Sequence, residues 1–447
     1  MLSESLRQDI LALVRQQVVP AIGCTEPICV ALATARATER LGSIPAKIRV
    51  RLSANILKNA MGVGIPGTGM VGLPIAVALG ALVGRSAYGL EVLRDATPED
   101  MEAGKRFIEE GRIEISLANN ISEKLYVDVL TLDETGHYTQ ATIAEEHTKF
   151  VDCESRSNVA FVGEDASSLT THDSDAGSGG TDEGTNPCIG HGIGKRLNMR
   201  MVYDFAATTP LEEIAFINEA GKVNMEASAQ SLKGNYGHCL GKALTRPLGR
   251  GIMGDNIFSH ILSATSSACD ARMAGAMIPV MSNSGSGNQG ICATNPVMVF
   301  AKENHNTDEE LTRALMLSHL TAIYIKQHLG SLSALCGCVV ASTGSACGIT
   351  YLMGGDYTHI TAAVKNMIAN LTGMICDGAK PSCALKLTSG VSTAVLSAML
   401  AMQGECVSSV EGIIDDCVDR SIRNLAEIGK NAMNETDRKV LDIMTNK

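Results

Sequence analysis

The spacing of apolar residues changes several times along the first 150 positions, which indicates a mixture of helices and strands. Residues 4–20 repeat apolar side chains as an amphipathic helix does, whereas residues 47–53 alternate as a half-buried strand does. Thr97 followed by Pro98 is typical of a helix start and predicts a helix over 98–110. Four later runs predict the strands of an antiparallel meander: residues 113–117, 125–132, 137–143 and 159–162.

The second half of the chain has helical periodicity almost throughout. Residues 165–186 are rich in Ser, Thr, Gly and Asp and lack Lys and Arg, which predicts a flexible acidic insertion near a domain boundary. Beyond it, residues 209–212 and 307–310 have the pattern of capping boxes. We therefore expect an α+β protein, with a mixed α/β domain at 1–205 and a larger all-helical domain at 206–447.

Two long uncharged segments, residues 61–84 and 334–354, raise the question of a membrane. Glycines interrupt both segments, and two prolines interrupt the first. Neither segment therefore offers the ~20 continuous apolar residues of a spanning helix. We expect buried core helices, and a transporter with broken helices is the alternative.

Composition narrows the class of protein. The 447 residues are 45% hydrophobic with a net charge of -11, which argues against overall disorder and allows two or three domains. The acidic balance and the lack of a Lys/Arg cluster argue against nucleic-acid binding. The first residues lack the pattern of a secretory signal, so we expect a cytoplasmic protein whose 14 cysteines do not form a disulfide framework.

A glycine-rich segment at 62–72 contains two literal matches to the dinucleotide-binding fingerprint GxGxxG. That fingerprint requires a strand before it, but the preceding residues are not typical of a strand and Pro66 lies inside the turn. The better interpretation is a glycine turn that lines a site or packs helices closely.

A second polar segment, residues 282–290 (SNSGSGNQG), precedes an apolar run and is expected to open a helix. Its hydroxyls, amides and free backbone N–H groups, at the positive end of a helix dipole, suit a carboxylate or a phosphate. Arg272 lies upstream and offers a guanidinium fork for a carboxylate. The alternative is a structural loop beside a surface ion pair.

Cysteines form a third pattern. Cys336 and Cys338 are followed, about 40 residues later, by Cys376 and Cys383, with Gly and Pro between the last two. Such a loop can turn two sulfur atoms toward one centre, and thiolates select zinc or iron–sulfur clusters. By spacing alone, a metal site and a set of buried thiols are both open interpretations.

Cys24, within GCTEP, is expected at the start of a helix. The pKa of a thiol falls at that positive end, so Cys24 could be a ligand or a base, and an inert buried thiol is the alternative. His238 lies in a polar, glycine-containing cluster and could be an acid or base, or a structural histidine.

Together these segments resemble those of the oxygen-sensitive iron–sulfur L-cysteine desulfidases, which are relatives of the bacterial iron–sulfur L-serine dehydratases. The resemblance extends from about residue 10 to the C-terminus, and the acidic insertion matches least well. The motifs that carry it are GCTEP at 23–27, PGTGMVGLPIA at 66–76, DARMAGA at 270–276, SNSGSGNQGI at 282–291, SALCG at 333–337 and MICDGAKPSCALK at 374–386.

The resemblance implies a [4Fe–4S] enzyme in which an α/β domain packs on a helical domain similar to the α part of L-serine dehydratase. In that family three cysteines hold the cluster and leave one iron open for substrate. These positions match Cys336, Cys376 and Cys383. A further family cysteine, which is a fourth ligand or the catalytic base, matches Cys24. Cys338 lies beside Cys336 and competes with it for the assignment.

The implied reaction is β-elimination of hydrogen sulfide from L-cysteine, with pyruvate and ammonia as products. Departure of the sulfur would be stabilised at the open iron, and Cys24 would take the α-proton. We expect the amino-acid substrate to be held by Arg272, Ser282, Asn283, Ser284, Ser286 and Asn288. Dehydration of L-serine or L-threonine by the same cluster is the alternative.

Two alternatives belong to other classes: a zinc protein with structural thiolates, and the membrane transporter. Pyridoxal phosphate is the usual cofactor for such eliminations, but Lys380 and Lys386 are weak candidates for its Schiff-base lysine. We expect a small-molecule substrate, with neither nucleic acid nor membrane as partner. A two-part chain of this length is compatible with a homodimer.

Overall fold

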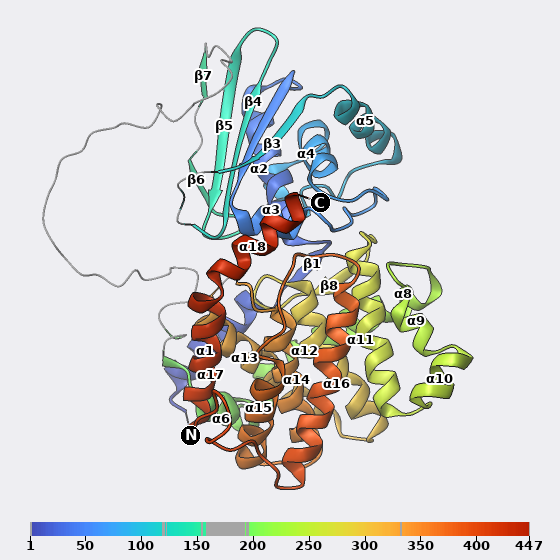
Figure 1. The fold of residues 1–447 in the computed structure, drawn as a ribbon, viewed down its shortest axis with the longest axis vertical. Helices are drawn as coiled ribbons and strands as arrows, with labels where there is room; N and C mark the ends of the chain where they lie inside the picture. Colours follow the sequence, from blue (N-terminus) through green and yellow to red (C-terminus); the bar gives the residue numbers. More distant parts are fainter. Residues whose placement is uncertain are drawn as a thin grey trace, which may run out of the picture.

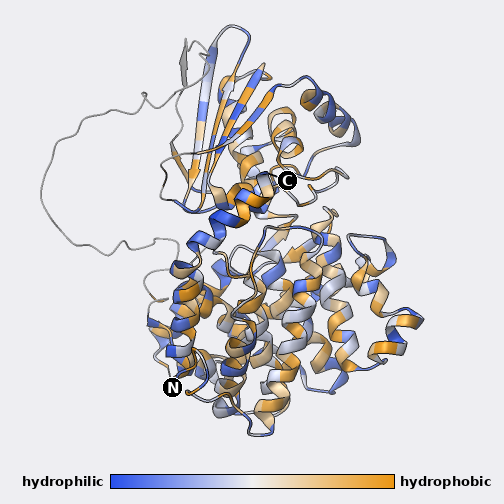
Figure 2. Ribbon diagram, viewed as in Figure 1, coloured by the Kyte–Doolittle hydropathy of each residue, from blue (hydrophilic) through white to orange (hydrophobic). Residues whose placement is uncertain are grey.

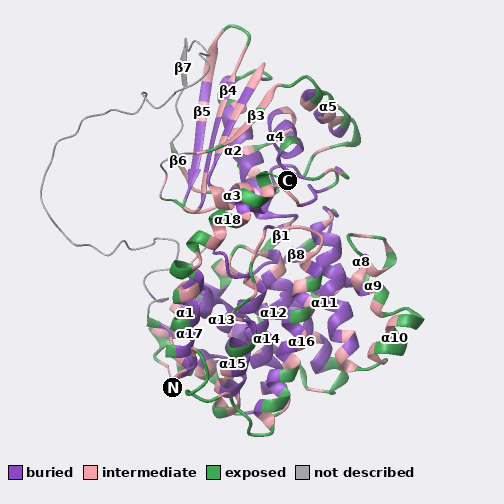
Figure 3. Ribbon diagram, viewed as in Figure 1, coloured by how far each residue is buried: buried purple, intermediate pink, exposed green. Residues whose placement is uncertain are grey.

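The computed structural model describes residues 2–118, 121, 123–152, 155–157, 193, 196–330 and 333–446. It has a mixed α+β architecture, in which a sheet in the N-terminal half stands over a bundle of helices (Figure 1). The buried residues form two clusters, one around the sheet and one inside the bundle (Figure 3). The predicted strand at 159–162 and the predicted insertion at 165–186 lie outside the described residues.

The sheet has the strand order β3-β2-β4-β5-β6, and β7 pairs with β5. Strand β3 runs parallel to β2, whereas β2, β4 and β5 are antiparallel neighbours. The predicted meander is therefore wrong for β3, because the helices between β2 and β3 carry the chain back to the same end of the sheet. The strands are β2 (Lys47–Leu52), β3 (Ile113–Leu117), β4 (Tyr126–Leu132), β5 (His137–Ala144), β6 (Phe150–Asp152) and β7 (Ser155–Ser157).

Two helices, α2 (Thr25–Leu41) and α4 (Leu73–Leu82), pack on each other and on the sheet. Every second residue of β2 is buried beneath them, as the sequence predicts, and the alternation of hydrophobic and hydrophilic residues can be followed along the strands in Figure 2. The two helices approach closely because Gly80 has no side chain: a Cβ there would lie 2.6 Å from the carbonyl oxygen of Ala31.

Two of the predicted helix starts are confirmed. Helices α5 (Pro98–Glu109) and α13 (Asp308–Leu329) both begin with a capping box. The box predicted at 209–212 is wrong, because Thr209 is buried at the end of the preceding helix. Its carbonyl oxygen accepts a hydrogen bond from Nη1 of Arg313 at 3.0 Å, so the residue closes one helix and does not open another.

Helix α14 (Gly337–Leu352) lies at the centre of the bundle and is buried along most of its length. It belongs to the uncharged segment at 334–354, so the prediction of a buried core helix is confirmed there, as it is for α4 in the segment at 61–84. The helices of the bundle around it are α6 (Met199–Thr208), α7 (Leu211–Ile214), α8 (Asn218–Lys233), α9 (Leu240–Leu244), α10 (Pro247–Met253), α11 (Ile257–Met273), α12 (Gly287–Glu303), α15 (Tyr357–Leu371), α16 (Cys383–Met402) and α17 (Val418–Glu427).

One helix in the described part of the chain, α16, is long and apolar enough to cross a membrane by length and composition. Half of its most apolar window is buried against the rest of the protein. Core helices of globular proteins pass the same test, so this feature is weak evidence for a membrane span.

The two clusters of buried residues do not correspond to two consecutive parts of the sequence. Helix α1 (Glu4–Gln17), predicted within the mixed domain at 1–205, packs in the helical cluster, because its apolar face lies against α13. Strand β1 (Pro20–Ile22) pairs with β8 (Pro279–Met281), so the helical half also holds a short strand and is not all-helical. The boundary at residue 206 itself stays a prediction.

The glycine-rich segment at 62–72 joins the two halves as a tight turn, as predicted. The N–H of Gly64 donates to the carbonyl oxygen of Met273 at 3.0 Å. A Cβ on Gly64 would lie 2.4 Å from the carbonyl carbon of Ala274, so only glycine allows this contact between backbones. This segment matches a nucleotide-binding fingerprint because both features need glycine, which here allows two backbones to pack closely.

The last helix of the chain crosses back to the N-terminal half. Helix α18 (Asn434–Thr445) lies beside α3 (Ala54–Ala60) (Figure 1). There Asp437 forms an ion pair with Lys58, which is 2% exposed, and accepts a hydrogen bond from Nδ2 of Asn55 at 2.6 Å. This buried junction fixes the two halves relative to each other.

Candidate active site

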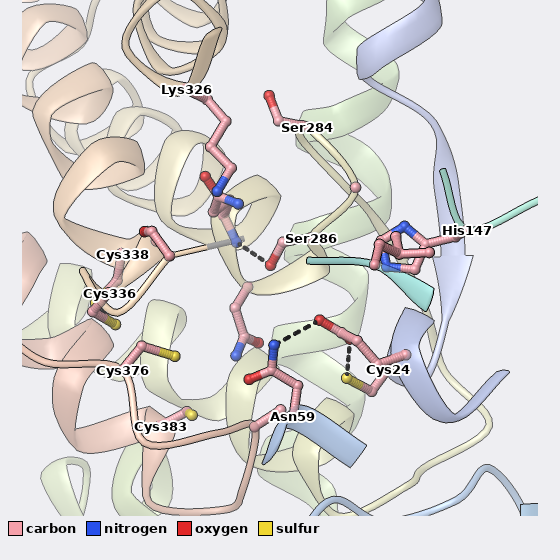
Figure 4. A pocket seen from close by; sticks show the side chains of 18 of the residues that line it. Cys24, Asn59, His147, Ser284, Ser286, Lys326, Cys336, Cys338, Cys376 and Cys383 are labelled. Atoms are coloured by element: carbon pink, nitrogen blue, oxygen red, sulfur yellow. Dashed lines mark hydrogen bonds between the residues drawn. The ribbon is translucent and has the colours of Figure 1, made fainter. Parts of the chain in front are cut away.

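A cavity of about 350 Å³ is lined by residues of both halves (Figure 4). Most of the predicted site residues lie on its wall, although their positions in the sequence are far apart. These residues are Cys24, Arg272, Ser284, Ser286, Asn288, Cys336, Cys376 and Cys383. The structure therefore brings the N-terminal cysteine, the polar loop and the C-terminal cysteines to one place.

Backbone hydrogen bonds place Cys336 beside Cys376. The N–H of Cys336 donates to the carbonyl oxygen of Met374 at 2.9 Å, and the N–H of Cys376 donates to that of Ala334 at 2.7 Å. Cys383 follows at the first residue of α16. The three sulfur atoms lie on the same side of the cavity (Figure 4).

Cys338 supports Cys336. Their Sγ atoms are 3.0 Å apart, and Sγ of Cys338 also lies 3.7 Å from the carbonyl oxygen of Lys386. The hydrogen bond from Cys338 lowers the pKa of Cys336 to about 7, whereas the same contact and burial raise the pKa of Cys338 well above its ordinary value. Of this pair, Cys336 is therefore the more acidic thiol.

Positive charge surrounds the loop that carries Cys376. Lys386 and Lys380 both form ion pairs with Asp377, and Nζ of Lys386 also donates to the carbonyl oxygen of Ile375 at 2.7 Å. The two lysines considered as Schiff-base partners are therefore engaged in holding this loop. Such an environment favours a group of negative charge beside the thiols.

Cys24 is the N-cap of α2, as predicted, but its thiol is not activated by the helix. Its side chain is 2% exposed, and Sγ donates to Oε2 of Glu26 at 2.9 Å. Burial first, and the Glu26 carboxylate second, raise the pKa of Cys24 well above its ordinary value. The expected lowering is wrong because desolvation and a neighbouring anion outweigh the helix dipole.

Glu26 lies at the centre of the hydrogen bonds on this side of the cavity. Its Oε2 accepts from Cys24, and its Oε1 accepts from Nδ2 of Asn59 at 3.3 Å. Burial acts to raise the pKa of Glu26, but the charge of His147 and the hydrogen bond from Cys24 hold it below its ordinary value. An ionised carboxylate in contact with a protonated thiol is a pair through which a proton can move.

The polar loop presents Ser284 and Ser286 to the cavity (Figure 4). Ser286 is the N-cap of α12, and its Oγ accepts from a backbone N–H of the first turn, as expected for a loop that opens a helix. The side chains of Ser282 and Asn283 are engaged within the protein. Oγ of Ser282 donates to a backbone carbonyl at 2.7 Å, and the amide of Asn283 contacts a buried histidine of α13.

Arg272 reaches the cavity from the end of α11 and is 3% exposed. Its Nη1 donates to Oδ1 of Asn288 at 3.0 Å. A Cβ on Gly287 would lie 2.2 Å from Nε of Arg272, so the glycine makes room for the guanidinium. The charge of Arg272 also favours the ionised form of Glu26.

Several cavity residues are not singled out by the sequence patterns. Glu26 lies inside GCTEP, and an acid two residues from a candidate cysteine is a signal that could have found it. Lys326 interrupts an apolar stretch of α13, and a lone lysine in a buried helix is a comparable signal. Asn59 and His147 lack such a signal, because only the tertiary fold brings them to the cavity.

Lys326 and His147 approach the cavity from opposite elements (Figure 4). Burial lowers the pKa of Lys326 to about 8, which leaves the ammonium mostly charged at neutral pH. Burial likewise lowers the pKa of His147, and its Nε2 is buried without a hydrogen-bond partner in the described structure. His238, the other histidine considered from the sequence, is exposed.

Cysteine thiols are the donors that the cavity wall offers to a metal cofactor. Within the described ranges, no group of three His, Cys, Asp or Glu side chains lies close enough to hold one metal ion. The thiols of Cys336, Cys376 and Cys383 line one wall of the 350 Å³ cavity, and thiolates are the ligands of iron–sulfur clusters, so their chemistry fits such a cofactor. Burial raises the pKa of Cys383 to about 11, but a metal-bound thiol is deprotonated outright.

The chain is similar to one protein family and to several relatives. A family model described as serine dehydratase alpha chain matches residues 87–442. The chain is 62% identical to a UPF0597 protein of Bacteroides fragilis over 446 residues, with 100% of both chains covered. It is also 63% identical to one of Bacteroides thetaiotaomicron over 99% of both chains, and 44% identical to one of Oleidesulfovibrio alaskensis over 97% of both.

Proposed function

Because the chain belongs to the serine dehydratase α-chain family, we propose that it is a carbon–sulfur lyase that converts L-cysteine into pyruvate, hydrogen sulfide and ammonia with a [4Fe–4S] cluster. The family is typically iron–sulfur dependent, so an enzyme with a cluster is the general expectation. The choice of L-cysteine as substrate is our proposal.

One observation carries the proposal: five thiols from two halves of the chain line the same cavity. Cys336, Cys376 and Cys383 would hold the cluster on one side, and Cys24 faces them from the other (Figure 4). With three thiolate ligands from the protein, a bound cluster would supply a Lewis acid for the departing group at its remaining iron. Cys338 would stabilise the Cys336 ligand by its hydrogen bond.

The pair formed by Cys24 and Glu26 is our candidate for the base. Sγ of Cys24 already donates to Glu26, and the raised pKa of Cys24 beside the lowered pKa of Glu26 keeps the proton on sulfur, so the carboxylate must accept this proton before the thiolate can take the α-hydrogen. The electrons of the Cα–H bond form the Cα=Cβ double bond, and the Cβ–S bond breaks with its electron pair on sulfur. The resulting aminoacrylate becomes an imine, and water converts it into pyruvate and ammonia.

The polar loop and Arg272 would orient the amino acid for this step. Hydroxyl groups of Ser284 and Ser286 face the cavity, and Asn288 is held in place by Arg272. A substrate fixed at its carboxylate and ammonium groups presents its β-substituent in one direction only, which places the leaving group against the cysteine wall.

Dehydration of L-serine is the second candidate function, and the family model favours it. Both reactions require the same base, the same Lewis acid and the same anchors. They differ in the leaving group, which is sulfide in one case and hydroxide in the other. A softer leaving atom has the higher affinity for iron already bound to thiolates, which supports L-cysteine.

Anaerobic purification followed by turnover assays tests the proposal. We expect brown protein with about 4 iron and about 4 sulfide per chain, and pyruvate formation from L-cysteine with a higher kcat/KM than from L-serine. A higher kcat/KM for L-serine would assign the dehydratase function. Colourless protein that contains zinc would contradict both.

A further inference from the structure

Lys326 carries a buried charge that has no hydrogen-bonded or ion-paired partner among the described residues. It lies on α13, is 9% exposed, and its side chain extends into the cavity (Figure 4). Among the residues that the structure describes, none forms an ion pair or a hydrogen bond with its Nζ. A buried ammonium is unfavourable unless an anion compensates it, so its position indicates that an anion occupies the cavity during function.

The other lysines near the cavity are paired with carboxylates. Lys386 is paired with Asp377, and Lys58 with Asp437. Arg272 donates to Asn288 through Nη1, but its Nε is buried without a hydrogen-bond partner in the described structure. Lys326 therefore differs from the two other lysines in having no carboxylate partner among the described residues, and Arg272 is the second cation that could contact a bound anion.

Uncompensated polar atoms lie around the same space. Oε1 of Gln289 and Nε2 of His147 are buried, and neither has a hydrogen-bond partner within the described structure. The hydroxyls of Ser284 and Ser286 also line the cavity, although Ser284 already donates to Oδ1 of Asn283 at 2.9 Å and Ser286 accepts from the N–H of Gln289. A ligand with both donors and acceptors, such as an amino acid, would satisfy Gln289 and His147, whereas an apolar ligand would leave them unpaired.

We propose that Lys326 binds the α-carboxylate of the substrate, with the ammonium group of the substrate toward Glu26. This inference rests on the proposed function. Lys326 and Glu26 supply one positive and one negative group to the same cavity, which matches the two charges of an α-amino acid. An amino acid held in this way has two fixed points, and the cavity wall that carries Cys336 and Cys376 would limit how its side chain can turn about them.

Binding of L-alanine to the purified holoenzyme tests the inference, because this amino acid has both charges but lacks a β-leaving group. Its amide, L-alaninamide, lacks the carboxylate and serves as the matched ligand. Titration calorimetry is performed on wild type, Lys326→Met and Lys326→Arg, and on Lys302→Met as a control at an exposed lysine. Iron content and thermal melting of each variant are measured in the same preparations.

We expect Lys326→Met to weaken L-alanine binding about 10- to 100-fold, as loss of a charged hydrogen bond does, with little change for L-alaninamide. Lys326→Arg should recover part of the loss, and Lys302→Met should bind as wild type does. Equal binding by Lys326→Met and wild type would overturn the inference while leaving the lyase proposal intact. Equal weakening of L-alanine and L-alaninamide binding by Lys326→Met would overturn the inference and make Lys326 a structural residue. Loss of iron without loss of L-alanine binding would also overturn it and make Lys326 a residue that compensates the charge of the cofactor.

The wild-type titration separates the two proposals. Wild type that prefers L-alanine to L-alaninamide has a carboxylate site, whichever residue supplies it. Wild type that binds neither ligand would contradict an amino-acid lyase altogether.

Discussion

Nδ2 of Asn283 donates a hydrogen bond to Nδ1 of His319 over 3.1 Å, deep inside the bundle. Nε2 of the same ring lies 3.0 Å from Oγ1 of Thr294, whose hydroxyl donates to the carbonyl oxygen of Gly290 at 2.7 Å. Because Nδ1 accepts, Nε2 must donate, and the ring is neutral. The polar loop of the cavity is therefore held in place by His319, whose Nδ1 must stay unprotonated to accept the hydrogen bond from Asn283.

The stability of the protein should therefore depend on pH through His319. Burial lowers its pKa from 6.5 to about 3. Above pH 6.5 the His319 ring is neutral in both the folded and the unfolded protein. Below pH 6.5 the ring takes up a proton in the unfolded chain but stays neutral in the folded protein. The free energy of unfolding then falls by about 1.4 kcal/mol per pH unit from this residue alone, down to about pH 3.

Urea unfolding of wild type and His319→Gln at pH 7.5 and 5.5 measures this effect. The variant should be less stable at pH 7.5, because it disrupts the network, and the difference should shrink by about 1 kcal/mol at pH 5.5. The same difference at both pH values would show that His319 does not titrate between the folded and unfolded states.

Serine substitutions of the cysteine wall should separate ligands from supporting residues. Cys336→Ser, Cys376→Ser and Cys383→Ser should each lose the iron chromophore, because each removes a thiolate from the same wall of the cavity. Cys338→Ser should keep it, since a hydroxyl can still donate to Cys336. Visible absorption and iron content under anaerobic conditions are the measurements. A colourless Cys338→Ser beside a brown Cys336→Ser would reverse the assignment of the pair.

Cys24→Ala and Glu26→Gln should both keep iron but lose most of the elimination rate. A general base contributes ~100- to ~10,000-fold, and the hydrogen bond between these side chains makes them one unit. The double variant should therefore be little worse than either single variant. Independent, multiplicative losses would separate the two roles, and wild-type turnover by Cys24→Ala would exclude the thiol as base.

The ion pair between Lys58 and Asp437 should respond asymmetrically to substitution. Asp437→Ala leaves a buried ammonium without its partner and should lower the free energy of unfolding by about 3–5 kcal/mol. Replacing both residues, as Lys58→Met with Asp437→Leu, should recover much of that loss because no charge is then left unpaired. Denaturant unfolding of the single and double variants decides the matter. A double variant less stable than Asp437→Ala would contradict this account.

Gly290 should not tolerate a methyl group. A Cβ there would lie 1.9 Å from the carbonyl oxygen of Met281, so Gly290→Ala must displace the loop or the strand β8. Overpacking of this kind costs about 1–3 kcal/mol or more. Gly251→Ala, in the exposed helix α10, is the control, since the described atoms leave its Cβ position open and alanine favours the helix by about 1 kcal/mol. Equal melting temperatures for the two variants would contradict the steric argument.

The features that could be predicted from the sequence are mostly local ones. The capping box at Thr307 and the alternation of β2 depend on neighbouring residues, and both are confirmed. The placement of β3 beside β2 depends on residues far apart in the chain, so the order of strands along the sequence suggested the wrong pairing. Likewise Thr209 matched a capping pattern, but Arg313 from another helix uses its carbonyl group.

The candidate site shows the same limit. The types of residue that gather in the cavity were evident from the motifs, since Cys24, Ser286 and Cys376 all line it. The environments of these residues were not evident from the motifs, because the pKa of Cys24 depends on burial and on the orientation of Glu26. Lys326 was missed because a single lysine in an apolar helix can be recognised as a site residue only once the structure shows that it lines the cavity.

The bond between Lys58 and Asp437 also bears on how the protein is made. Lys58 precedes Asp437 by 379 residues, so it leaves the ribosome long before its partner, and Nζ of Lys58 also donates to the carbonyl oxygen of Cys376 at 3.3 Å. The ion pair that positions Lys58 against that loop can therefore form only after α18 has been synthesised, although earlier segments can fold during synthesis. A chain terminated before α18 would contain Cys376 but lack the ion pair that holds Lys58 against its loop.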